Sequence, residues 1–339
     1  MINFIFISVI INLTFCLFFE KISLRINIFD IPDESRKIHK KKVAAIGGFL
    51  YLINLILFLL YLIIFDGFLD KYQINFLNGL KQYFSFFFIS SLIFIVGVID
   101  DKVNLSALKK LIIFISLIIL SLIDQNIIIG SLNFELLNFK IILNEIGIFF
   151  SIISIFYFMN ALNMYDGIDI QTPLYLFLLF VFLIFKEQNF IIFLIIPSIF
   201  FLFLNFIGKC FLGNSGTYFL GYLISIILIK LNQANSNLLT IEEILILISI
   251  PSIELFRLFF ERIIKNKNPL SADKNHIHHF LRKEFNNLTT SLITNGLIFI
   301  PLVISQFTNY KMIIFILQFC LYFLLIYKLK KKQSKKNYL

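Results

Sequence analysis

A chain of 339 residues with 59% hydrophobic side chains and 45 phenylalanines cannot hide its apolar surface in a soluble core. Even a large globular domain leaves much of its surface in water. The mean hydropathy of +0.91 therefore predicts an integral membrane protein. The net charge of +10 accompanies basic residues placed between apolar runs, which favours a role in membrane topology over nucleic-acid binding.

Apolar runs close to the ~20 residues that span a bilayer recur along the whole chain. They predict an all-α fold in which about eleven transmembrane helices form a single integral-membrane domain over residues 1–339. The first run has no basic segment and no small-residue cleavage site, so we expect a retained helix and no signal peptide. The expected spans are about 2–19, 46–65, 84–99, 109–123, 146–162, 173–186, 190–207, 217–230, 242–260, 292–305 and 312–327.

Residues 127–143 do not fit this pattern. They alternate around Gly and Asn, which favours a short β-hairpin on one face of the molecule over a further span.

Lysine and arginine collect on one side of the eleven spans. The loop after the first span, every second loop after it and the basic tail 328–339 together hold 24 of the 30 basic residues. Cytoplasmic loops carry such an excess, so we expect the N-terminus outside and the tail inside a bacterial inner membrane. The tail also suits contact with anionic lipid, and we expect no nucleic-acid partner.

Polar clusters fall on the same predicted cytoplasmic side. They are residues 30–48, 98–110, 160–169, 211–222 and 251–279. Acidic residues at the end of a span cost free energy unless they are paired, hydrated or bound to a ligand. We therefore expect an active site at the boundary between membrane and cytosol.

Two of these clusters are rich in acidic and amide side chains. Asp100 and Asp101 directly follow an apolar span, and their mutual repulsion favours a bound cation or the protonation of one carboxyl group. Asn163, Asp166 and Asp169 lie three residues apart, so a helix would place them on one face. Carboxylate and amide oxygens suit magnesium. A solvated or capped helix end is the alternative for both clusters.

The other clusters suit phosphate groups. The segment GNSG at 213–216 opens an apolar span, where backbone N–H groups and the helix dipole favour an anion, although a plain loop would look the same. His276, His278 and His279 lack the further ligands of a zinc site, and the basic loop around them favours phosphate or nucleotide binding. Arg36 and His39 suit phosphate as well, although the positive-inside bias alone would place basic residues there.

Taken together, these segments resemble the polyprenyl-phosphate N-acetylhexosamine-1-phosphate transferase family, which includes WecA-like and MraY-like enzymes. The resemblance runs from Asp30 to His279 in the family's order. HIHH is similar to the motif of the WecA-like branch. The segments that carry it are DIPDESRKIH…GG, DDKVNLSALKK, NALNMYDGID, FLGNSGTYFLG and DKNHIHHFL.

The resemblance implies a reaction. The phosphate of a polyprenyl (undecaprenyl) phosphate attacks the β-phosphorus of a UDP-sugar, UMP leaves, and the lipid-linked product starts a cell-envelope glycan such as O-antigen. Magnesium would bridge the diphosphate. The resemblance implies catalytic roles for Asp100, Asp101 and Asp169, and metal binding by Asn163, Asn214 and Asp101. The implied substrate-binding residues are Arg36, His39, Lys110, Asp166, His276, His278 and His279.

The sequence also departs from the family. Asn214 stands where the motif GD-x-GS has an aspartate, so one negative charge is missing, and Glu254 stands where aspartate is usual. Ile170 replaces a glycine. These departures leave open a phospho-N-acetylmuramoyl-pentapeptide transferase, a non-catalytic relative that only binds substrate, and a transporter. The sequence identifies neither the sugar nor the oligomeric state.

Overall fold

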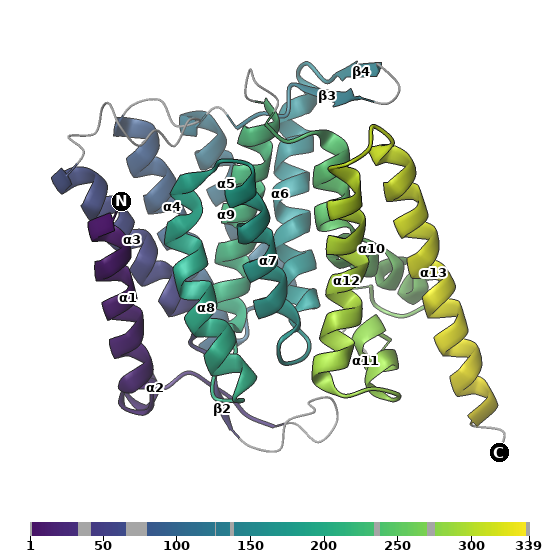
Figure 1. Ribbon diagram of the computed structural model, residues 1–339, viewed down its shortest axis with the longest axis horizontal. Coiled ribbons are helices and arrows are strands. Elements are labelled where there is room, and N and C mark those ends of the chain that lie inside the picture. The colour runs from purple at the N-terminus through teal and green to yellow at the C-terminus, as the bar shows by residue number, and fades with distance from the viewer. Residues whose placement is uncertain are drawn as a thin grey trace.

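The structure is a computed structural model that describes residues 2–32, 42–65, 80–125, 127–135, 139–233, 238–269 and 275–336. Long helices stand side by side and run between two ends of the molecule (Figure 1). Each predicted apolar run coincides with one of them. They are α1 Ile2–Leu17, α3 Gly47–Phe65, α4 Leu80–Val103, α5 Ala107–Gln125, α6 Ile146–Tyr165, α7 Gln171–Phe185, α8 Ile192–Phe206, α9 Gly213–Gln233, α10 Ile241–Ile264, α12 Asn287–Ser305 and α13 Lys311–Lys336.

Length and composition make this a polytopic membrane protein. Within the described ranges, six helices are long and apolar enough to cross a bilayer: α3, α6, α8 with the preceding turn η1 Asn189–Ile191, α9, α12 and α13. The pair of α1 and α2 Phe19–Ile26, bent by 76°, would be a seventh. The remaining long helices, α4, α5, α7 and α10, are shorter or less apolar. The count of eleven spans stays a prediction.

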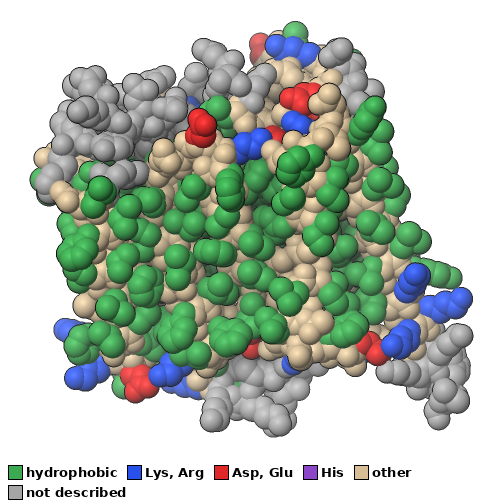
Figure 2. All heavy atoms as spheres, in the orientation of Figure 1, with side chains coloured by type: hydrophobic (Ala, Val, Ile, Leu, Met, Phe, Trp, Pro, Cys, Tyr) green, Lys and Arg blue, Asp and Glu red, His purple; other side chains and the backbone are tan. Residues whose placement is uncertain are grey.

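The surface agrees with a bilayer environment. Hydrophobic side chains form a band across the middle of the molecule, and the lysines, arginines and acidic residues lie toward its two ends (Figure 2). Many of the large apolar side chains in this band are exposed, including Phe203 and Ile300. In water such a surface would drive aggregation, whereas lipid solvates it.

Two short hairpins show that the fold is not purely all-α. β3 Ser131–Phe134 pairs with β4 Phe139–Ile142 in antiparallel fashion, which confirms the hairpin expected in 127–143. β1 Phe29–Asp30 pairs with β2 Val43–Ala44. The hairpin ladder continues beyond β2, because Phe211 donates its N–H to the carbonyl of Ala44 at 2.8 Å. This pairing ties the first polar loop to the loop before α9.

Helix α9 occupies the centre of the core. It packs against α3, α4 and α6, and nearly all of its residues are buried. Small residues allow this close approach: a methyl group on Gly97 of α4 would overlap the Cα of Ser215 at the start of α9. The end of α4, with its two aspartates, is therefore fixed against the segment GNSG.

The loops that hold the polar clusters meet at one end of the bundle. Figure 1 shows α2, β2, α11 Ile277–Arg282 and the C-terminus at the lower end, and the β3–β4 hairpin at the upper end. The end with α11 is the one predicted to face the cytoplasm.

Candidate active site

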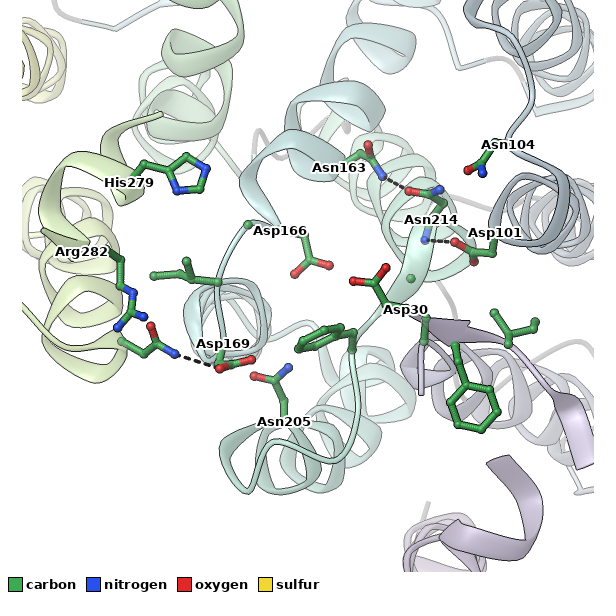
Figure 3. Close-up of a pocket in the computed structure, with 18 residues that line it drawn as sticks. Asp30, Asp101, Asn104, Asn163, Asp166, Asp169, Asn205, Asn214, His279 and Arg282 are labelled. Carbon is green, nitrogen blue, oxygen red and sulfur yellow. Dashed lines mark hydrogen bonds between the residues drawn. The ribbon is translucent and has the colours of Figure 1, made fainter. Parts of the chain in front are cut away.

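A cavity of about 500 Å³ lies where α6 ends and α9 begins (Figure 3). Four aspartates and five asparagines dominate its polar lining, and apolar side chains such as Phe29 and Phe211 complete its wall. The polar lining residues are Asp30, Asp101, Asn104, Asn163, Asp166, Asp169, Asn205, Asn214, His279, Arg282 and Asn287. The predicted polar clusters thus converge on one space.

Asp101 joins the end of α4 to the start of α9. Its two carboxylate oxygens accept the backbone N–H groups of Asn214 at 2.8 Å and of Ser215 at 2.9 Å. A carboxylate at this position is stabilised by the unpaired N–H groups and the dipole of the helix. The helix start predicted at GNSG is confirmed, but the anion at these N–H groups is Asp101 of the same chain.

Asp100 points away from the cavity. Its buried carboxylate accepts the N–H of Leu105 at 2.8 Å and pairs with the Nζ of Lys110 at 3.2 Å. Successive residues of a helix do not share a face, so only one of two adjacent aspartates can reach the site. Neither Asp100 nor Lys110 lines the cavity. In this arrangement Lys110 neutralises Asp100, and a direct role of either residue on substrate stays a prediction.

Asp166 and Asp169 reach the cavity from a loop. The prediction that they share a helix face was wrong, because α6 ends at Tyr165 and Asp166 caps it with non-helical backbone angles. The loop is held from two sides: Asn287 donates to Asp169 Oδ2 at 2.8 Å, and Ser291 donates to the carbonyl of Asp169 at 3.0 Å. The carboxylates of Asp166 and Asp30 point toward each other (Figure 3).

The loop ends in a strained residue. Ile170 has a φ of 72°, which is unusual for a β-branched residue and explains why a glycine would suit this position. Asn205 holds it there. The Asn205 side chain accepts the N–H of Ile170 at 2.6 Å and donates to the carbonyl of Cys210 at 2.8 Å, so one amide supports two loops.

Burial and the crowding of negative charge change the ionisation of Asp166. Burial is the larger cause, and together with the nearby carboxylates of Asp169, Asp101 and Asp30 it raises the pKa of Asp166 to about 7. A cation in the cavity would reverse this effect because it favours the ionised carboxylate.

The residues that line the cavity fit a magnesium ion only if the substrate supplies some of its ligands. No group of three or more His, Cys, Asp or Glu side chains in the described part of the chain is arranged to hold a metal. Magnesium usually takes one or two carboxylates, several waters and the substrate phosphates. The aspartates of this cavity can supply that smaller share.

Asn214 is held by another amide. The Nδ2 of Asn163 donates to Asn214 Oδ1 at 2.8 Å and to Thr217 Oγ1 at 2.7 Å. The oxygen that Asn214 would offer to a metal is therefore already a hydrogen-bond acceptor, so binding of the metal by Asn214 would have to compete with this bond. Its role as a ligand stays a prediction.

The three histidines of HIHH take different positions. His279 lines the cavity, whereas His278 is buried against Gly167, where an added methyl group would overlap its imidazole ring. His276 stacks on His278 with ring centroids 5.0 Å apart. Burial, followed by the charges of His276 and His279, lowers the pKa of His278 well below its ordinary value, so this ring stays neutral. Only His279 is placed to contact a substrate directly.

Glu254 positions this histidine segment. Its buried carboxylate accepts the N–H of Ile277 at 2.8 Å and pairs with Arg257 at 2.7 Å, and Tyr322 donates to it from α13. Arg257 also donates to the carbonyl of Asn275 at 2.7 Å. Glu254, which stands where the family usually has aspartate, therefore belongs to a hydrogen-bond network that fixes α11.

Comparisons with known proteins find membrane-lipid sugar-phosphate transferases similar to this chain. The chain is 24% identical over 283 residues to the undecaprenyl-phosphate alpha-N-acetylglucosaminyl 1-phosphate transferase of Salmonella typhi, covering 78% of this chain and 71% of that protein. The Escherichia coli O157:H7 protein of the same name is 24% identical, and the match covers 82% of this chain and 75% of that protein. A probable undecaprenyl-phosphate N-acetylglucosaminyl 1-phosphate transferase of Bacillus subtilis (strain 168) is 26% identical, with 77% and 72% covered.

A family model described as "Glycosyl transferase family 4" matches residues 83–232, the segment that runs from α4 through α9. Over this segment the chain is similar to glycosyl transferase family 4. The matched segment contributes Asp101, Asn163, Asp166 and Asp169 to the cavity.

Sequence reasoning missed several residues that line the cavity. Asp30 begins the first quoted motif and was a visible signal. Asn205, Arg282 and Asn287 carry no motif, and only folding brings them to the cavity. Arg36 and His39, which were predicted to bind substrate, lie outside the described residues.

Proposed function

We propose that the protein transfers an N-acetylhexosamine 1-phosphate from a UDP-sugar to polyprenyl phosphate and releases UMP. The convergence of four aspartates in one cavity at the end of an apolar helix bundle carries this proposal. A lipid phosphate in the bilayer and a water-soluble nucleotide can meet only at such an end. Relatives named for undecaprenyl phosphate support the acceptor.

In the proposed reaction, an oxygen of the lipid phosphate forms a bond to the β-phosphorus of the donor. The bond from that phosphorus to the bridging oxygen breaks, and UMP leaves with the electron pair. This chemistry depends on positioning and charge neutralisation more than on covalent catalysis. Four carboxylates alone would repel a diphosphate.

We propose that Asp101, Asp166 and Asn163 would hold a magnesium ion. When bound, this ion would supply positive charge that offsets the repulsion between the carboxylates and the diphosphate. The protein's own contribution is to fix these ligands: Asp101 through the start of α9, and Asp166 through the loop that Asn205 and Asn287 hold.

The location of the site follows from the same proposal. The loops predicted to lie on the side of α11 hold most of the basic residues of the sequence, and we place this end at the cytoplasmic face of a bacterial inner membrane. UDP-sugars would reach the cavity from that side.

The test is an incubation of membranes containing the protein with polyprenyl phosphate, Mg²⁺ and labelled UDP-N-acetylhexosamines. We expect label in the lipid extract, stoichiometric UMP, and loss of both with a chelator or with Asp166→Asn. Product formed in the presence of excess chelator would contradict the magnesium proposal.

An Asn214→Asp variant distinguishes a working enzyme from a weakened enzyme and from a non-catalytic relative. If wild type is active, the amide is tolerated, and we expect the Asp variant to need less Mg²⁺ because it adds a carboxylate beside Asn163. Product from the Asp variant alone would identify the natural chain as a weakened enzyme. No product from either variant with any UDP-sugar would favour the non-catalytic relative, and uptake of sugar into vesicles would favour a transporter.

A further inference from the structure

The charges of the cavity are unevenly distributed. Among the described lining residues, Arg282 is the one lysine or arginine, and the four aspartates oppose it. Figure 3 shows Arg282 and His279 on one side of the cavity, across from Asp101 and Asn163. In the described part of the chain, no ion pair joins Arg282 to a carboxylate. An arginine that lines the same cavity as four carboxylates, yet pairs with none of them, is available to another anion.

The surroundings of Arg282 point to a ligand. Its Nε is buried and has no hydrogen-bond partner, and the Oδ1 of Asn287, which lines the same cavity, is also buried without one. Asn287 uses its Nδ2 on Asp169 at 2.8 Å. A buried polar group that lacks a partner costs free energy, so such groups in a native protein usually meet a ligand or water. The guanidinium fork matches the oxygens of a phosphate group.

We infer that Arg282 binds the diphosphate of the donor substrate, on the side of the cavity opposite the proposed magnesium ligands. This inference rests on the proposed function for the identity of the donor. A diphosphate would then be neutralised from two sides, by the cation held on the aspartates and by the guanidinium on α11. Arg282 closes α11, and the network of Glu254 and the packing of His278 on Gly167 fix its position.

The neighbouring residue supplies a matched control. Lys283 follows Arg282 directly, does not line the cavity, and donates its Nζ to Gln333 Oε1 of α13 at 2.8 Å. Arg282→Gln and Lys283→Gln remove the same charge from adjacent positions. Arg282→Lys keeps the charge and removes the fork.

The experiment is isothermal titration of the purified full-length protein with UDP-N-acetylglucosamine and, separately, with inorganic diphosphate, both with Mg²⁺. We expect Arg282→Gln to raise both dissociation constants about tenfold or more, because hydrogen bonds to charged groups are the strong ones. Arg282→Lys should lie between this variant and wild type. Lys283→Gln should match wild type.

Thermal unfolding of each variant identifies any that fails to fold. If Arg282→Gln does not fold, the dissociation constants of Arg282→Lys test the inference instead. Unchanged dissociation constants in folded Arg282 variants would overturn the inference, and so would equal losses in the Lys283 variant. The proposed function is judged separately by lipid-linked product. A protein that binds inorganic diphosphate through Arg282 but makes no product with UDP-sugars would keep the anion site and refute the transferase.

Discussion

Asp166 shows how the site responds to protons. The folded protein holds this proton up to a pH of about 7, whereas an unfolded chain releases it near its ordinary pKa of about 4. The folded state binds more protons between these values, so the free energy of unfolding falls as pH rises through this window. Above the higher pKa the carboxylate is charged in both states.

We therefore expect the metal-free protein to lose thermal stability between pH 5 and about pH 7, and Asp166→Asn to reduce this loss. Unfolding temperatures at these two pH values for both proteins test this. Because Mg²⁺ binds the ionised carboxylate, its stabilising effect should weaken below about pH 7. Identical pH dependence in wild type and variant would contradict the assignment.

Single residues also mark the limit of sequence reasoning. Asp100 and Asp101 look equivalent in the sequence, and only the packing of α4 on α9 decides which one faces the cavity. Asp166 and Asp169 were placed together correctly, but through a helix that ends before them. Asn205 had no signal, because its role comes from a contact distant in sequence, and Arg282 carries no motif although it lines the cavity.

Among the elements, α11 depends on its contact with the 166–170 loop. In Gly167→Ala the new methyl group overlaps the His278 ring, so α11 must shift and carry His279 and Arg282 with it. We expect a higher KM for the donor and a lower unfolding temperature. Gly296→Ala in α12 is the control, since its methyl group meets no atom closer than 3.5 Å and alanine favours a helix. Equal effects of the two changes would argue against this contact.

The attachment of α11 to α10 gives another prediction. Glu254→Ala leaves the buried Arg257 paired with Glu261 alone and leaves the N–H of Ile277 without its acceptor, so we expect a loss of about 1–3 kcal/mol. Replacing both residues, as in Glu254→Met with Arg257→Leu, should cost less. Denaturant unfolding of the single and double variants measures the difference. A single variant as stable as wild type would show that the pair does not hold this network together.

At the scale of the whole molecule, the apolar runs predicted the helices well because lipid demands long, continuous apolar segments. The two short hairpins depend on tertiary pairing, and only the one in 127–143 had a local signal. Composition alone does not single out α4 and α10 as membrane spans, because both combine apolar runs with the charges of the site.

Labelling from outside the cell tests the orientation. In a cysteine-free background, Glu135→Cys beside the β3–β4 hairpin should react with a membrane-impermeant maleimide in intact cells. Lys283→Cys, at the other end of the bundle, should react only after the membrane is broken. The reverse pattern would place the cavity outside the cytoplasm and refute the proposed side of the reaction.

Asp101 has both a structural role and a place in the cavity, and this affects how the sequence of such a protein can change during evolution. The same carboxylate that lines the cavity also binds the first N–H groups of the central helix. A descendant that lost its activity would still need Asp101 to assemble α4 on α9. Retention of this aspartate in a sequence is therefore a sign of a preserved scaffold and a poor marker of a working enzyme. Asp166 caps α6 through its backbone N–H and not through its carboxylate, so it is the better residue by which to judge activity.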